Sequence, residues 1–76
     1  MTFNGVLAVR RRHADGDVVL VMNPRNAQFD FEIPVPCGDG SWIEELAGNR
    51  YEVMDGILKI GEIPACSAML FTQDRR

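Results

Sequence analysis

The sequence lacks several features that would place it in a large functional class. Its longest apolar run, Val18–Met22, is far shorter than the roughly 18 residues that a membrane-spanning helix needs. No basic, apolar and small-residue series typical of a signal peptide opens the chain. Basic residues are outnumbered, and the net charge of −3 argues against nucleic-acid binding, which needs a basic face. We therefore expect partners other than membranes or nucleic acids.

Cysteine and histidine are also scarce. Cys37 and Cys66 are too few for a disulfide framework, so we expect free, partly buried thiols and a cytoplasmic location. His13 and two distant cysteines show no metal-ligand spacing. No spacing of Ser67 or Cys66 with His13 supports a catalytic triad. The sequence thus predicts no catalytic, cofactor-binding or metal-binding residues, and it places His13 on a surface loop.

Helical periodicity is nearly absent, and short apolar runs alternate with turn residues instead. With 76 residues, the chain can form one small domain, residues 1–76. We predict an all-β fold of about seven short antiparallel strands without substantial helix. The predicted strands are Gly5–Arg12, Asp17–Asn23, Gln28–Ile33, Ser41–Leu46, Arg50–Met54, Ile57–Ile60 and Ser67–Gln73.

The dipeptide Asp55-Gly56 predicts the sharpest turn. Both residue types tolerate the positive φ angles of a two-residue type I′ hairpin. This register places Glu52 opposite Lys59 on one face of the hairpin. It gathers four apolar side chains on the other face: Tyr51, Val53, Leu58 and Ile60.

Two other strands indicate how the sheet is covered. Phe29, Phe31 and Ile33 alternate with polar residues, which predicts one packed and one solvated face. Val18–Met22 is apolar at every position, which predicts a central strand covered on both sides. Antiparallel strands of this kind bury their apolar faces in a two-sheet sandwich or, as the alternative, in a partly open barrel.

The order of these elements resembles the C-terminal β-domain of the α-amylase family of glycoside hydrolases. The resemblance covers an arginine-ended strand, Leu7–Arg11, a Val-rich strand ending in Asn, Asp17–Asn23, and an alternating strand running into proline, Phe29–Pro34. It continues through Trp42–Phe71, with its Asp-Gly hairpin, proline and final apolar strand. The chain departs from the family in a shorter start and in the Pro-Arg-Asn turn after Asn23.

The resemblance implies a Greek-key sandwich that packs against a catalytic barrel without performing catalysis. The chain alone would then be no enzyme, although its parent would be an α-amylase-family hydrolase or transglycosylase. Its partner would be that barrel or a second copy of the chain. Two alternatives stay open: a carbohydrate-binding module that contacts α-glucan through Trp42, and a free-standing protein that homodimerises through an exposed strand edge.

Three sets of side chains have a functional and a structural interpretation. Trp42 is either a platform for a sugar ring or a buried anchor between strands. Glu44 and Glu45 are adjacent in a strand, so they point to opposite faces and cannot form the facing pair of a glycosidase; we expect both to be solvated. The basic cluster Arg10–Arg12 is either solvated and paired with nearby acids or a docking point for an acidic partner surface.

Overall fold

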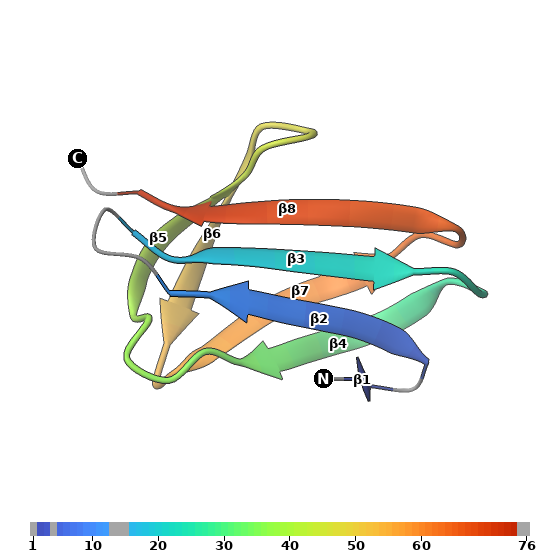
Figure 1. Ribbon diagram of the computed structural model, residues 1–76, viewed down its shortest axis with the longest axis horizontal. Helices are drawn as coiled ribbons and strands as arrows, with labels where there is room; N and C mark the ends of the chain where they lie inside the picture. Colours follow the sequence, from blue (N-terminus) through green and yellow to red (C-terminus); the bar gives the residue numbers. More distant parts are fainter. Residues whose placement is uncertain (1, 4, 13–15, 75–76) are drawn as a thin grey trace.

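Eight antiparallel strands make up the part of the chain that the structure describes (Figure 1). This computed structural model describes residues 2–3, 5–12 and 16–74. Within these residues there is no helix, so none could cross a lipid bilayer. The prediction of an all-β fold is confirmed. The strands are β1 (Thr2–Phe3), β2 (Val6–Arg11), β3 (Val18–Asn23), β4 (Gln28–Pro34), β5 (Gly40–Glu44), β6 (Asn49–Met54), β7 (Ile57–Ile63) and β8 (Ser67–Gln73).

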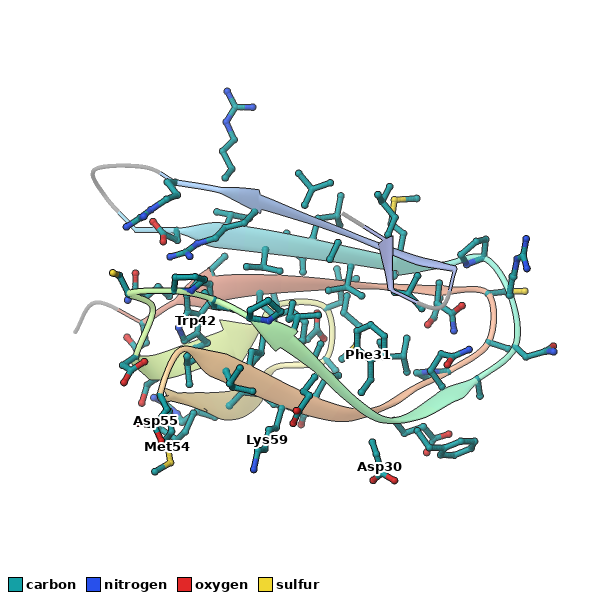
Figure 2. All side chains as sticks on the ribbon, turned by 90° about the horizontal axis from the view of Figure 1, so that it is seen from below. Asp30, Phe31, Trp42, Met54, Asp55 and Lys59 are labelled. Carbon is teal, nitrogen blue, oxygen red and sulfur yellow. The ribbon has the colours of Figure 1, made fainter. Side chains whose placement is uncertain are left out.

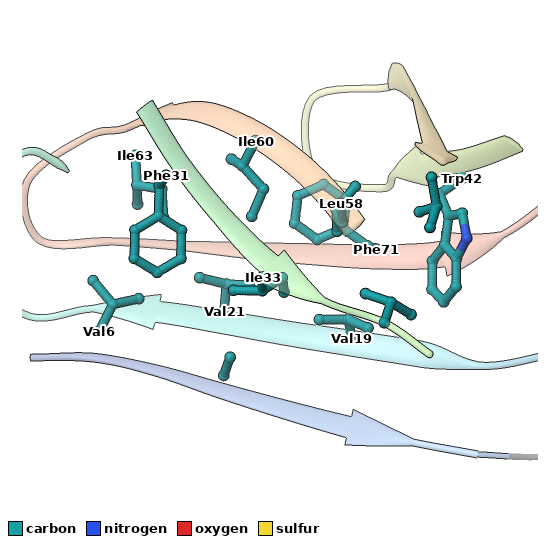
Figure 3. Close-up of a cluster of buried hydrophobic side chains, with 13 residues drawn as sticks. Val6, Val19, Val21, Phe31, Ile33, Trp42, Leu58, Ile60, Ile63 and Phe71 are labelled. Atoms are coloured by element: carbon teal, nitrogen blue, oxygen red, sulfur yellow. The ribbon is translucent and has the colours of Figure 1, made fainter. Parts of the chain in front are cut away.

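The strands form one sheet in the order β1-β2-β3-β8-β5-β6-β7-β4. The sheet curls, so that β4 and β7 lie across the inner face of β2, β3 and β8 (Figures 1 and 3). The result is a curled half-barrel, which is nearer to a partly open barrel than to two separate sheets. A hydrogen bond joins strand β2, near one edge of the sheet, to the segment after β4, the strand at the other edge. Arg10 Nη1 donates it to the carbonyl of Pro36 over 2.7 Å.

The core lies inside this curl, between the two ends of the sheet (Figure 3). Alternate residues of each strand point inward because the side-chain period of a strand is two. Tyr51 packs edge-on against Phe71, with ring centroids 5.2 Å apart. The predicted apolar group of the hairpin contributes to this core, with Tyr51 half-buried. The buried hydrophobic residues are Val6, Ala8, Val19, Val21, Phe31, Ile33, Val35, Trp42, Val53, Leu58, Ile60, Ile63 and Phe71.

The hairpin between β6 and β7 follows its prediction at the turn and departs from it farther along. Asp55 and Gly56 have φ angles of 55° and 71°, as a type I′ turn requires. Val53 pairs with Leu58 as expected. The pairing of β7 with β6 covers only Val53–Leu58 and Met54–Ile57, so it stops before the predicted pair of Glu52 with Lys59. Along its other edge β7 pairs with β4, where Lys59 lies opposite Glu32.

The alternation predicted for β4 holds only in its second half. Phe31 and Ile33 are buried, but Phe29 is 68% exposed. The register shifts between Gln28 and Phe31, and Asp30 takes a left-handed φ of 53°. Such a bulge reverses which residues face inward, and this turns Phe29 out to solvent.

Candidate docking face

Trp42 is a core residue. Its side chain is fully buried, and the indole N–H donates a hydrogen bond of 2.7 Å to the carbonyl of Gly38. Gly38 has to be small, because a Cβ there would lie 2.5 Å from Val35 Cγ1 and 3.3 Å from Trp42 Cζ2. Trp42 therefore has the structural role, that of the buried anchor. It offers no exposed ring on which a sugar in solution can stack.

The paired glutamates point to opposite faces as predicted, but only one of them is solvated. Glu44 is buried, which corrects the expectation for this residue. Its Oε1 accepts a hydrogen bond from Ala47 N (2.8 Å), and its Oε2 accepts from Leu46 N (3.1 Å) and Leu70 N (2.9 Å). Glu45 is exposed and accepts from Thr72 Oγ1. Glu44 thus ties the loop after β5 to β8.

The remaining candidates for chemistry do not come together. Ser67 Oγ donates to the carbonyl of Pro64, and His13 lies outside the described residues. Cys37 and Cys66 are free, as predicted, but both are exposed instead of partly buried. Among the described residues, no three His, Cys, Asp or Glu side chains are placed to hold a metal ion.

Two arginines of the cluster Arg10–Arg12 pair with an acid, and the third does not. Arg10 Nε donates to Asp17 Oδ2 over 3.1 Å, and Arg12 Nε lies 3.6 Å from the same oxygen. Both therefore pair with a nearby acid, as one interpretation predicted. Arg11 is exposed and forms no ion pair with the residues that the structure describes.

The feature of the surface that most needs an explanation is the outer side of β2, β3 and β8, which lie side by side in Figure 1. The prediction that β3 is covered on both sides is wrong within this chain. Val19 and Val21 are buried, whereas Leu20 and Met22 are 37% and 45% exposed. The curl of the sheet covers only its inner face. Val18, at the start of β3, is half-buried on the same side. We call six of the exposed or half-buried apolar residues there the aliphatic face: Leu7, Val9, Leu20, Met22, Ala68 and Leu70.

The register of the strands makes the aliphatic face continuous. One row across the sheet pairs Leu7 with Met22 and Met22 with Ala68. The next row pairs Val9 with Leu20 and Leu20 with Leu70. Paired side chains on one face of a sheet lie about 5 Å apart. The six residues therefore form a contiguous patch of two rows.

The patch deepens at one end into an apolar hollow of about 430 Å³. Leu7, Met22 and Ala68 form its floor on the strand side, and Pro24 and Cys66 line it from the turns that follow β3 and β7. Asn23 shapes these turns. Its side chain donates to the carbonyls of Asn26 (2.9 Å) and Pro64 (3.1 Å).

The opposite outer surface, over β4 and β7, has a different character. In Figure 2, Asp30, Lys59 and Asp55 point away from the core on the side opposite β2 and β3. Glu32 of β4 and Glu52 of β6 are exposed and line a shallow depression with Lys59, Met54 and Ile57. The large apolar side chains Phe29 and Met54 are also exposed, but they lie among charged residues. Large contiguous apolar patches are rare on monomers and usually mark a binding surface. The contrast between the two outer surfaces makes the aliphatic face the candidate functional site.

Part of this site was visible in the sequence. Val18–Met22 showed a strand that needs cover on both sides, and Leu7 and Val9 alternate with the buried Val6 and Ala8. The pairing of β3 with β8 joins residues more than 40 positions apart, and no local signal predicts it. Comparison of the chain with models of protein families, with curated proteins and with solved structures finds no match.

Proposed function

We propose that this chain is a non-catalytic accessory β-domain that docks through its aliphatic face on a partner domain. The observation that carries the proposal is the contiguous apolar patch on β2, β3 and β8, opposite a charged surface. Covering an aliphatic surface with a partner stabilises the complex by about 25 cal/mol for each Å² removed from water. The exposed aliphatic face therefore favours binding to another apolar surface.

The resemblance to the C-terminal domain of α-amylase-family enzymes gives the partner its proposed identity, a catalytic barrel. One topological observation supports the resemblance. The spatial order β8-β5-β6-β7 has the 4-1-2-3 arrangement of a Greek key, in which the fourth strand returns beside the first. We accordingly propose that the half-barrel is a variant of the Greek-key sandwich of that family. Two free thiols fit a cytoplasmic location.

The absence of catalysis is tested on the isolated chain. Starch, maltose and trehalose-like glucans are incubated with purified protein, and reducing sugar or glucose release is followed. We expect no turnover, because both carboxylate oxygens of Glu44 are engaged by backbone N–H groups, three in all. Hydrolysis that co-purifies with the chain and is lost on mutation of its carboxylates contradicts the proposal.

Docking is tested with an α-amylase-family barrel from which its own C-terminal β-domain has been removed. Such a barrel is co-expressed with this chain, and its soluble yield and activity are compared with those of the barrel alone. We expect a higher yield with the wild-type chain and none of this gain with Leu20→Glu, which puts a charge at the centre of the aliphatic face. Lys59→Glu, on the opposite surface, is the matched control and should retain the gain.

A second copy is the other occupant that the aliphatic face can accept. Size-exclusion chromatography with light scattering distinguishes the two cases without any partner. If the wild-type chain is dimeric and Leu20→Glu is monomeric, the face is a homodimer interface. If both are monomeric, the face is left for a different protein.

A further inference from the structure

The two ends of the aliphatic face each carry a free positive charge. Arg11 ends β2 and shares its outer side with Leu7 and Val9, because alternate residues of a strand point the same way,. Arg25 lies at the other end, in the turn that follows β3. Its Cδ is 3.4 Å from the position that a Cβ on Gly5 would occupy, and Gly5 directly precedes β2.

Neither arginine is neutralised within the described residues. Both are exposed, and the ion pairs found there join other arginines to Asp17 and Asp74. A rise of about 3.3 Å per residue separates the two ends of β2 by roughly 17 Å. This exceeds the Debye length of about 10 Å at 0.1 M salt, so each end acts as a separate positive site.

Among the described residues, no acid forms an ion pair with either arginine. Asp30, Glu32 and Glu52 lie on the opposite outer surface. Glu45 borders the aliphatic face, because its N–H donates to the carbonyl of Leu70, but its carboxylate already accepts from Thr72 Oγ1. Within the described residues Arg11 and Arg25 thus have no ion-pair partner, although the net charge of the chain is −3.

This arrangement disfavours a second copy as the occupant. Sheets that pack face to face in the aligned mode keep their strands within about 30° of each other. Because both ends of the face are basic, aligned packing in either strand direction brings arginine toward arginine. A lipid surface is disfavoured as well, since the face carries neither Trp nor Tyr and the net charge repels anionic headgroups,.

We propose that the aliphatic face binds a different protein surface, one with an apolar centre and carboxylates beyond both ends that pair with Arg11 and Arg25. This inference rests on the proposed docking function and names the chemistry of the partner. The apolar centre supplies most of the free energy, and the terminal charge pairs select the partner and its orientation.

The chain itself provides a probe with the complementary chemistry. The double variant Arg11→Glu/Arg25→Glu has the same apolar centre with acidic ends. We expect it to associate with the wild-type chain about tenfold more tightly than the wild-type chain associates with itself, because repulsion at both ends becomes attraction. Labelled wild-type protein is titrated with the variant at about 50 mM and at about 0.5 M salt, and the mixed pair should weaken at high salt.

Three controls make the result specific. Arg50→Glu/Lys59→Glu carries the same change of net charge away from the ends of the face, and it should not form the mixed pair. Leu20→Glu in the wild-type partner should abolish the pair. Circular dichroism checks that each variant is folded. If the double variant unfolds, the single variant Arg11→Glu replaces it, with about half the effect on the binding free energy.

The possible outcomes separate this inference from the docking function. Equal self-association of the wild-type chain, or a mixed pair that ignores salt, overturns the role of the arginines and leaves docking intact. No mixed pair at all also overturns the inference, and docking then depends on the barrel experiment alone. Binding of the wild-type chain to phosphatidylserine vesicles, lost in Arg11→Glu/Arg25→Glu, overturns it in favour of a lipid surface.

Discussion

Substitution of Glu44 by alanine should be among the most destabilising changes to a polar residue of this protein. Glu44 is 2% exposed, and its carboxylate accepts hydrogen bonds from three backbone N–H groups, those of Leu46, Ala47 and Leu70. Leu70 belongs to β8, so its N–H sits within the sheet, whereas the other two belong to the exposed turn after β5. Alanine removes the acceptor for all three donors.

The magnitude follows from which donors water can reach. A hydrogen bond to a charged group contributes about 1.5–3 kcal/mol, and an unsatisfied buried donor costs about 1–3 kcal/mol. Water can replace the carboxylate more readily at the exposed Leu46 and Ala47 than at the half-buried Leu70. We therefore expect Glu44→Ala to lower the free energy of unfolding by about 3 kcal/mol. For a domain of this size, this corresponds to a fall in Tm of about 12–24 °C.

Glutamine gives an intermediate test. Its amide has one oxygen, which best replaces Oε2 with its two bonds, while the NH₂ group then faces Ala47 N in place of Oε1. One of three bonds is lost, and the cost should be about 1–2 kcal/mol. Urea unfolding followed by Trp fluorescence gives both values, and Glu45→Ala, on the exposed side, is the control, with a change below about 0.5 kcal/mol. Should Glu44→Ala match this control, the three hydrogen bonds do not stabilise the fold.

Three further changes probe the same structure. Trp42→Phe keeps a ring but leaves the Gly38 carbonyl without its donor, and it should lower the free energy of unfolding by about 1–3 kcal/mol. In the native protein, maltooligosaccharides should not quench the fluorescence of Trp42. Saturable quenching argues for a sugar site. Gly38→Ala forces a Cβ to within 2.5 Å of Val35 Cγ1 and should cost about 1–3 kcal/mol through overpacking, measured by thermal unfolding; an unchanged Tm refutes the contact. Titration of native protein with a thiol reagent should modify Cys37 and Cys66 rapidly, as both are exposed; one or no reactive thiol contradicts this.

Strand positions could be predicted here because turn chemistry is local. Asp55-Gly56 specifies a turn through its own φ angles, and the neighbouring pair of Val53 with Leu58 follows from that turn alone. Prolines and glycines likewise mark the ends of β3 and β4. The partner of Lys59 could not be predicted in the same way, because a hairpin sequence does not encode where its two strands separate. That depends on the curl of the whole sheet, in which β7 also pairs with β4 along its other edge.

The bulge at Asp30 and the burial of Glu44 were hidden for a related reason. Alternation in Gln28–Ile33 has the same appearance whether or not one residue is inserted into the ladder, and the insertion exchanges inside for outside at Phe29. A glutamate in a strand usually indicates solvent, since burial of a charge is costly without partners. The partners of Glu44 come from its own following turn and from β8, and only the folded chain brings them together.

The aliphatic face contributes less than the core to the free energy of unfolding of the isolated chain, and this bears on its function. Leu20 and Val9 are 37% and 48% exposed, so replacing either with a polar residue removes little buried area from the isolated chain. Exposed substitutions of this kind usually change the free energy of unfolding by less than about 0.5 kcal/mol. Val9→Thr, for example, makes the face more polar but retains the β-branched shape that suits a strand. Stability alone therefore gives no reason for six apolar residues in two paired rows on this side, while Asp30, Glu32 and Lys59 are exposed on β4 and β7. A requirement for cover by a partner accounts for both.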